Sequence, residues 1–378
     1  MLKSHKYRIY PNEAQQEQLA KAFGCARFVY NLGLETKIAA WTTANVYYSH
    51  IDLANQMKVL KDTEAPFLKD CPSQALQASL RNLDIAYTNF FKRGTGFPRF
   101  KNKHSKQSIS LPQGTKLSDD GKQIFIPKLK WVDIDLHRAL PEGEVKTVTV
   151  SRTTTGRFFV SILIDTKREL PKKKEIKRYT AVGVDLGVKD FAVTSDGMKF
   201  ENKDFMKSTI KQLRVAQRSL ARKVKGSNRY ERQRQVVALL HEKVRNQRQD
   251  YLHKISSYLV NKYDTICIED LSVSNMVKNR NLARAISDQG WREFRSMLEY
   301  KAEWQGKNIQ VIGRFDPSSK TCSCCGKINK ELKLSDRSWI CSSCNSSHDR
   351  DVNAAINIKT FGLRNQPRMS QREPMGCA

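Results

Sequence analysis

Four cysteines near the C-terminus restrict the fold more than any other feature of this chain. Cys322 and Cys325 are separated by two residues, as are Cys341 and Cys344, and fifteen residues lie between the two pairs. This is the spacing of a four-thiolate zinc ribbon, in which the metal stabilises a segment too short for a core of its own. We therefore predict that residues 317–347 bind one structural Zn²⁺, because four thiolates leave no open coordination position for catalysis.

The remaining cysteines argue against a disulfide framework. The chain has nine cysteines, an odd number, and five of them fall within residues 322–344. The other four are scattered singly, at Cys25, Cys71, Cys267 and Cys377. This distribution is typical of a metal site in a reducing compartment. Cys324, inside the first pair, and His348, beyond the second, are predicted not to be ligands.

The charge of the chain indicates its partner. Among 378 residues, 67 are Lys or Arg and 38 are Asp or Glu, which gives a net charge of +29. A compact protein with this much like charge repels itself unless it binds a large polyanion, so nucleic acid is the expected partner. The sequence has no apolar run of about 18 residues and no secretory leader, which favours a cytoplasmic protein without a membrane segment.

The first half of the chain combines a β-rich and a helical region. The alternating residues 1–11 predict a strand, and residues 12–104 predict a small helical domain that begins with an Asn12–Gln15 cap. Residues 105–170 are rich in β-formers and turns, which favours a barrel that also pairs with the first strand. The charged segment 171–178 is predicted to be a linker.

A basic, aromatic loop follows the helical region. Within residues 92–108, Phe97 and Phe100 could stack on bases while Arg99 contacts phosphate. The alternative is a solvated loop that the two phenylalanines anchor to the core.

The second half has the order expected of an α/β domain. A hairpin at 180–200 is followed by two basic helices at 206–247, which contain twelve Lys or Arg and two acids. This excess of positive charge on the two helices favours contact with a phosphate backbone over a face that is only solvated. A strand at 265–270, a helix at 286–306, a strand at 308–315 and a last helix complete the pattern, and the polar residues after 362 are predicted to be disordered.

Three acids interrupt apolar patterns in this half. Asp185 lies between two glycines on one face of its predicted strand, where a backbone or ligand can approach. Glu269 ends the apolar run 266–268, at the strand end where α/β sheets place ligands. Asp351 lies in the first turn of the last helix, and the predicted cap Asp349 leaves it free to point elsewhere.

Each acid alone is more typical of a cap or a surface residue, but the combination suggests chemistry. Three neighbouring carboxylates need cations to offset their repulsion. Two Mg²⁺ or Mn²⁺ ions about 4 Å apart would do so, and would hold the attacking and leaving oxygens of a phosphodiester. The order of elements is that of a ribonuclease-H-like fold. The sequence contains no P-loop for ATP and no serine nucleophile elbow.

Seven segments, in order along nearly the whole chain, carry a family resemblance. They are YRIYPN, GFPRF, GVDLGVKDFA, CIEDLSVSNM, SDQGWREFRSMLEYKAEW, PSSKTCSCCG and WICSSCNSSHDRDVNAAINI. On these segments the chain resembles TnpB, the transposon-encoded RNA-guided DNA endonucleases related to type V CRISPR effectors.

The resemblance implies a multidomain α/β fold plus a β-barrel. Residues 1–11 and 105–170 would form a wedge barrel, 12–104 an inserted helical recognition domain, and 179–316 with 348–362 a RuvC-like nuclease that carries the zinc ribbon. Residues 363–378 would be a disordered tail. The resemblance places catalysis on Asp185, Glu269 and Asp351, which would also bind the two Mg²⁺ ions.

The resemblance also implies the partners and their contacts. A guide RNA from the transposon end would direct the protein to complementary double-stranded DNA beside a short motif, in the cytosol of a prokaryote near the nucleoid and without a required protein partner. The expected nucleic-acid contacts are Gln77 for that motif, Phe97 and Arg99 in the loop, and Lys211, Arg214, Arg218 and Arg222 in the basic helices.

Two other functions compete with this hypothesis. A nuclease-inactive, RNA-guided regulator would occupy DNA without cutting it, and loss of one of the three acids would be its signature. A guide-independent nuclease of the RuvC type would cut without bound RNA.

Overall fold

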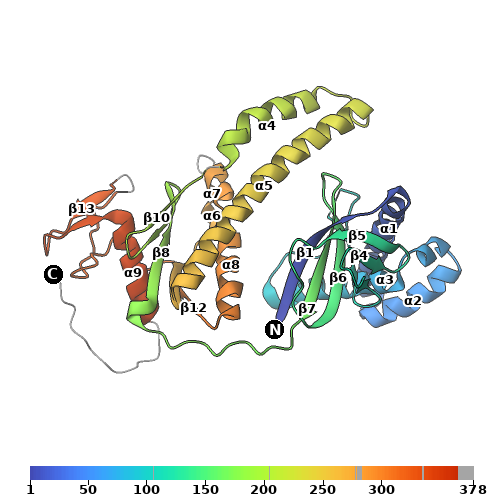
Figure 1. Cartoon of the computed structure of the whole chain (residues 1–378), viewed down its shortest axis with the longest axis horizontal. Helices are drawn as coiled ribbons and strands as arrows, with labels where there is room; N and C mark the ends of the chain where they lie inside the picture. Colours follow the sequence, from blue (N-terminus) through green and yellow to red (C-terminus); the bar gives the residue numbers. More distant parts are fainter. Residues whose placement is uncertain (105, 204, 277, 279–282, 334–335, 365–378) are drawn as a thin grey trace. The chain divides into compact units, whose positions relative to one another are not determined.

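The computed structural model describes residues 1–378 except 105, 204, 277, 279–282, 334–335 and 365–378. The chain forms two compact units, Met1–Glu169 and Leu170–Ala378, each built around a sheet of its own (Figure 1). The boundary falls beside the linker predicted at 171–178. No helix in the described part of the chain has the length and apolarity needed to cross a membrane.

The first unit contains a seven-stranded antiparallel sheet in the order β2-β6-β7-β1-β5-β4-β3. The strands are β1 (Leu2–Tyr10), β2 (Gln107–Leu111), β3 (Lys116–Leu117), β4 (Gln123–Ile126), β5 (Lys130–Asp135), β6 (Glu144–Arg152) and β7 (Phe158–Asp165). The N-terminal strand lies inside this sheet, between β7 and β5, which confirms the predicted pairing. In the described residues no ladder joins β2 to β3, so the sheet is a half-barrel rather than the closed barrel expected from the sequence.

Helices are inserted between β1 and β2. They are α1 (Glu13–Ala44), α2 (His50–Asp62), a 3₁₀ turn at Pro66–Asp70 and α3 (Ser73–Arg93). The predicted cap is confirmed, because Asn12 and Gln15 form a complete capping box at the start of α1. Asn45, in the left-handed region at φ 55°, ends α1 and separates it from α2.

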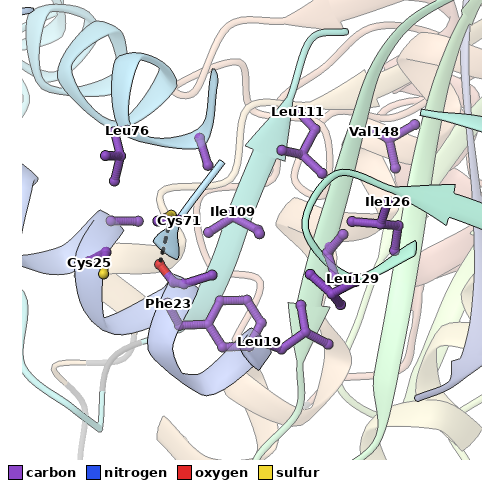
Figure 2. Packing of buried hydrophobic residues seen from close by; sticks show 14 of the residues in the cluster. Leu19, Phe23, Cys25, Cys71, Leu76, Ile109, Leu111, Ile126, Leu129 and Val148 are labelled. Carbon is purple, nitrogen blue, oxygen red and sulfur yellow. Dashed lines mark hydrogen bonds between the residues drawn. The ribbon is translucent and has the colours of Figure 1, made fainter. Parts of the chain in front are cut away.

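The helices and the sheet of this unit share one apolar core (Figure 2). Leu19 and Phe23 of α1 and Leu76 of α3 are buried against Ile109 and Leu111 of β2. Burying each such side chain contributes roughly 1.5–3 kcal/mol, so this contact is what attaches the helical insertion to the sheet.

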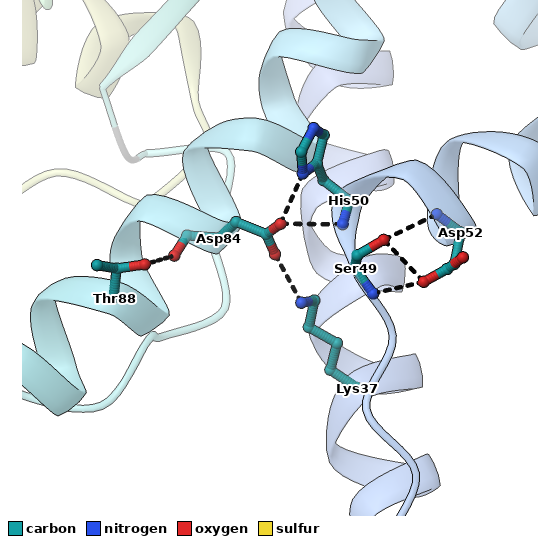
Figure 3. Close-up of polar contacts among 6 residues, drawn as sticks. All are labelled: Lys37, Ser49, His50, Asp52, Asp84 and Thr88. Atoms are coloured by element: carbon teal, nitrogen blue, oxygen red, sulfur yellow. Dashed lines mark hydrogen bonds and ion pairs between the residues drawn. The ribbon is translucent and has the colours of Figure 1, made fainter.

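A polar network ties α2 to the other two helices (Figure 3). Asp84 of α3 accepts a hydrogen bond from the buried Lys37 Nζ of α1 at 2.6 Å. Its other oxygen accepts from the backbone N–H of His50, at 2.9 Å, and lies 2.8 Å from His50 Nδ1. Burial opposes the charge of Asp84, but these partners hold the pKa of its carboxyl below the usual value.

The second unit contains a five-stranded mixed sheet in the order β10-β9-β8-β11-β12. The strands are β8 (Ala181–Leu186), β9 (Asp190–Thr194), β10 (Lys199–Glu201), β11 (Thr265–Glu269) and β12 (Asn308–Ile312). β11 is parallel to both β8 and β12, whereas β8, β9 and β10 form antiparallel pairs. The hairpin and the two later strands follow the predicted order.

The remaining elements of this unit are a 3₁₀ turn at Arg178–Thr180, α4 (Phe205–Ala221), α5 (Asn228–Lys262), α6 (Val273–Met276), α7 (Ala283–Gln289), α8 (Trp291–Trp304), β13 (Ser338–Ile340), β14 (Ser347–Asp349) and α9 (Arg350–Arg364). The predicted break between the basic helices is confirmed, and Ser227 caps α5. The helix predicted at 286–306 is instead two helices, because Gly290 adopts φ 67° between α7 and α8. Residues 363 and 364 belong to α9, and the rest of the predicted tail, with Cys377, lies outside the described residues.

Candidate active site and metal centre

Two of the predicted acids lie at the same end of neighbouring strands. β8 and β11 run parallel, and Val184 is paired with Ile268. The next residue of each strand is a carboxylate, Asp185 on β8 and Glu269 on β11. Both side chains therefore emerge at the carboxyl edge of the sheet, the usual position of ligand sites in α/β folds.

Helix α9 brings the third acid to this edge. Asp349 caps the helix as predicted, since its Oδ1 accepts from the backbone N–H groups of Asp351 and Val352 at 3.0 and 3.1 Å. The helix packs directly on β8 at Gly183, where an added Cβ would lie 1.9 Å from the carbonyl oxygen of Ala355. Only glycine permits this approach, which places the first turn of α9 beside the end of β8.

The charges at this edge act on one another. Burial raises the pKa of Asp185 to about 8, and the negative charges of Glu269 and Asp351 add to the effect, while Arg350 opposes it. Burial also raises the pKa of Glu269, although the Ser318 hydroxyl donates to Glu269 Oε1 at 2.5 Å and favours the charged form. The sequence did not reveal Ser318, since its partner lies 49 residues away in the chain.

The three carboxylates are near one another but not tightly clustered. They are not among the sets of described ligand atoms that all lie within 4.8 Å of one another. The closest cation to Asp351 is Arg337, whose Nη1 lies 3.8 Å from Asp351 Oδ2. Arg337 and Arg350 offset part of this negative charge, yet the pKa of Asp185 stays raised, which is the property expected of a site for divalent cations.

The four predicted zinc ligands do form a tight cluster. The sulfurs of Cys322, Cys325, Cys341 and Cys344 all lie within 4.8 Å of one another. Cys322 Sγ is 3.6 Å from Cys344 Sγ, and Cys325 Sγ is 3.6 Å from Cys341 Sγ. Four thiolates at the usual Zn–S length of about 2.3 Å would be about 3.8 Å apart, so this arrangement could bind zinc.

His348, which the sequence argument set aside, lies against this cluster. Its Nε2 is 3.1 Å from Cys322 Sγ and 2.9 Å from Ser346 Oγ, and its ring packs on Trp339 with centroids 4.7 Å apart. Cys322, Cys324 and His348 form a second set of close ligand atoms. Burial disfavours the Cys322 thiolate, but backbone N–H groups, Ser346 and His348 lower its pKa to about 5.

The predicted nucleic-acid contacts are spread over both units. Gln77 lies on α3 and is half-buried, and Arg99 is exposed. Phe97 packs edge-on against Tyr87 and Phe90, with ring centroids 5.5 and 5.4 Å apart, yet stays 46% exposed. The basic residues of the second unit are all exposed, on α4 or directly after it: Lys211, Arg214, Arg218 and Arg222.

Family models match three parts of the chain. Residues 161–280 match the model described as "Probable transposase", and residues 291–358 match "Cas12f1-like, TNB domain". Residues 1–45 match a "Helix-turn-helix domain", although in the structure this segment is β1 followed by one continuous helix, α1.

Solved structures share the fold. The chain is similar to Cas12f1 in a complex with sgRNA and target DNA, at 14% identity and TM-score 0.50, over 95% of this chain and 98% of that one. It is also similar to the mini-RNA-guided endonuclease CRISPR-Cas_phi3, at 9% identity and TM-score 0.52, over 98% and 94%. With its mixed sheet, acidic edge and four-cysteine cluster, the chain has the fold class of Cas12-type effectors.

Sequence relatives place the chain within that class. It is 41% identical to a "Putative RNA-guided DNA endonuclease" of Streptomyces pristinaespiralis, over 96% of this chain and 89% of that protein. It is 36% identical to "Putative RNA-guided DNA endonuclease InsQ" of Escherichia coli K12, over 96% and 92%. The chain belongs to the TnpB family, the OrfB proteins of IS605-type insertion sequences.

Proposed function

We propose that the protein is an RNA-guided DNA endonuclease of an insertion sequence. The observation that carries the proposal is the group of three acids at one sheet edge, where burial and like charge raise the pKa of Asp185 to about 8. The names of the relatives and the excess of 29 positive charges support nucleic acid as both guide and substrate. The partners in this proposal are a guide RNA from the transposon end and complementary double-stranded DNA.

The donor set fits two Mg²⁺ or Mn²⁺ ions. Asp185, Glu269 and Asp351 offer hard oxygen ligands, and their mutual repulsion would be relieved by divalent cations. When bound, two such ions activate a water and stabilise the departing 3′ oxygen of a phosphodiester. In this proposal the three acids are the catalytic residues.

The chain itself positions these acids. The hydroxyl of Ser318 orients Glu269 by donating to Oε1. Asp349 fixes the backbone of Asp351 as the helix cap, and the contact at Gly183 holds α9 on β8. A strand end, a capped helix and one hydroxyl therefore position these acids before any ligand binds, as electrostatic preorganisation requires.

The same proposal assigns the other parts of the chain. The half-barrel with residues 12–104 would be the wedge and recognition domains, 179–316 with 348–362 the RuvC-like nuclease, and 317–347 a ribbon with one structural Zn²⁺. Gln77 would read the target-adjacent motif, Phe97 and Arg99 would contact the backbone, and the exposed cations from Lys211 to Arg222 would line the guide–target channel. The protein would act in the prokaryotic cytosol, at the nucleoid.

The test is cleavage by the protein purified with its guide RNA. Asp351→Ala should abolish Mg²⁺-dependent cutting of complementary DNA and leave RNA and target binding nearly unchanged. Glu303→Gln, which neutralises an exposed acid of α8, is the matched control and should cut normally. Normal cutting by Asp351→Ala would refute the assignment.

The two alternatives predict different results in the same experiment. A nuclease-inactive regulator would bind target DNA without cutting it, but all three acids are present and they converge on one edge. A guide-independent nuclease would cut without RNA, so removal of the copurifying RNA separates it from a guided enzyme. The relatives named as RNA-guided endonucleases do not favour either alternative.

A further inference from the structure

A hollow opens beside Glu269, between the carboxyl edge of the sheet and helix α8. Its volume is about 750 Å³, and its walls include Glu269, Trp291, Arg292, Arg295, Glu299 and Arg314. This size lies in the range of small-molecule and nucleotide sites. Because Glu269 is one of the proposed metal ligands, whatever occupies the hollow lies next to the reacting phosphodiester.

Two of the three arginines are held by acids of the protein. Arg295 Nη1 donates to Asp270 Oδ1 at 2.9 Å, and its Nε donates to Glu299 Oε1 at 2.9 Å. Arg314 Nη2 donates to Asp270 Oδ2 at 2.8 Å. Asp270 thus connects α8 to the segment that follows β12 and fixes two guanidinium groups in the wall, with their charges largely balanced by Asp270 and Glu299.

The third arginine has no such partner. Arg292 is exposed, and its guanidinium makes no hydrogen bond or ion pair with any other residue that the structure describes. It lies three residues before Arg295 on α8, so both side chains are on the same helix face. Arg292 is therefore the cation of this hollow that remains available to an anion from outside the chain.

We propose that this hollow is a subsite for the cleaved DNA strand, in which Arg292 binds a phosphate next to the scissile one. The proposal rests on the proposed function and deepens it, since it names how the strand is held at the acids. A guanidinium matches a phosphate by paired hydrogen bonds. Arg295 and Arg314, which are paired with Asp270, form part of the wall of the hollow.

The test replaces single phosphates of the cleaved strand by neutral methylphosphonates, one position at a time. With wild-type protein and guide RNA, cleavage should slow by about tenfold to a hundredfold at one position flanking the cut. Arg292→Ala should slow cleavage of unmodified DNA by a similar factor. The cleavage rate of this variant should no longer change when the phosphate at that position is replaced by a methylphosphonate. Arg292→Lys, which keeps the charge, should retain part of the response.

A matched control separates this effect from general loss of charge. Lys254→Ala removes an exposed cation of α5 that is paired with Asp250, and it should cut like wild type and keep the full methylphosphonate response. Cleavage by Arg292→Ala at the wild-type rate would overturn the subsite. So would a methylphosphonate response of Arg292→Ala that equals that of wild type at every position.

A second measurement distinguishes failure of the subsite from failure of the nuclease assignment. Binding of a fluorescent single-stranded DNA oligonucleotide is measured in EDTA, where no cleavage occurs. Arg292→Ala should bind the oligonucleotide about tenfold more weakly than wild type. The slope of the logarithm of its affinity against the logarithm of salt concentration should fall by the amount expected for about one lost phosphate contact. If wild type binds in this way but never cuts, the proposed function is wrong and the subsite stands, and equal binding by both proteins refutes the subsite.

Discussion

Asp84 in the first unit and Asp185 in the second are both half-buried acids, yet their surroundings have opposite effects on the pKa. The ammonium of Lys37 and the backbone N–H of His50 hold the pKa of Asp84 below the usual value. Burial, Glu269 and Asp351 raise the pKa of Asp185 to about 8. One acid is neutralised by its own chain, and the other is surrounded by like charge.

This contrast separates a structural acid, Asp84, from Asp185, the acid that we propose is functional. The half-buried carboxylate of Asp84, paired with the buried ammonium of Lys37, joins three helices and needs no ligand (Figure 3). A carboxylate kept among other carboxylates costs folding free energy, and such sites are found where a ligand supplies the missing charge. The four cysteine sulfurs are likewise gathered close together, and a bound cation would offset the repulsion of their thiolates.

The largest expected effect is that of replacing Asp185, which should lower cleavage activity while raising the stability of the metal-free protein. Asp185→Asn should reduce Mg²⁺-dependent cleavage by about a thousandfold or more, because one of the three proposed metal ligands is lost. Near neutral pH the same substitution should raise the unfolding free energy of the metal-free protein, since it removes a carboxyl group whose raised pKa opposes folding at that pH. Cleavage assays and thermal melts in EDTA measure the two effects, and a destabilised Asp185→Asn protein would contradict this account.

Loss of a cysteine ligand should come next in size. Cys341→Ser should lower the zinc content measured by atomic emission and open the ribbon to limited proteolysis between residues 317 and 347, because the three thiolates that remain bind the metal more weakly and the segment folds only with its metal. Cys324→Ser, which leaves the four-sulfur set intact, is the control. Equal zinc content in wild type and Cys341→Ser would exclude the ribbon.

Asp84→Asn should act in the opposite direction to Asp185→Asn. It leaves Lys37 buried without its partner, and we expect a loss of about 3 kcal/mol in unfolding free energy. Asp62→Asn breaks an exposed ion pair with Lys69 and should cost less than about 1 kcal/mol. Chemical denaturation measures both, and equal losses would show that Asp84 is not a buried anchor.

The smallest effect is a pair of opposite pH dependences. Asp185 has a raised pKa in the folded protein, so its contribution to stability is full at low pH and is lost as the pH rises towards about 8. Asp84 has a lowered pKa, so its contribution is present above the usual carboxyl range and is lost as the pH falls below it. The melting temperatures of metal-free wild type, Asp185→Asn and Asp84→Asn are measured as a function of pH. The difference between wild type and each variant should change with pH as described, and melting temperatures that change in parallel in all three proteins would disprove both contributions.

Features set by neighbouring residues could be predicted from the sequence. The Asn12–Gln15 capping box, the Asp349 cap and the Cys-x-x-Cys pairs each depend on a few adjacent positions. The strand position of Asp185 followed from period-two patterning, which also fixes the sheet face, and that of Glu269 followed from the end of the apolar run 266–268.

Features that depend on which surfaces meet could not be predicted. His348 contacts Cys322 because two turns of the ribbon fold together, and Lys37 meets Asp84 because α1 packs on α3. The break at Gly290 escaped detection because the apolar spacing continues across it, and only its positive φ ends the helix. The sheet of the first unit was expected to close into a barrel, but the structure leaves it open. Local sequence patterns predict strands and turns, and they do not reveal whether the two edge strands pair with each other.

The junction between the ribbon and the last helix has a mechanical consequence. β14 ends at Asp349 and α9 begins at Arg350, and the side chain of Asp349 holds the amide of Asp351. With no spacer between them, a rotation of the hairpin is transmitted to Asp351 instead of being absorbed by a loop. A zinc chelator, added with Mg²⁺ in excess, should therefore stop cleavage at concentrations that leave the rest of the second unit folded, because the sulfur cluster would control the position of Asp351 from a distance.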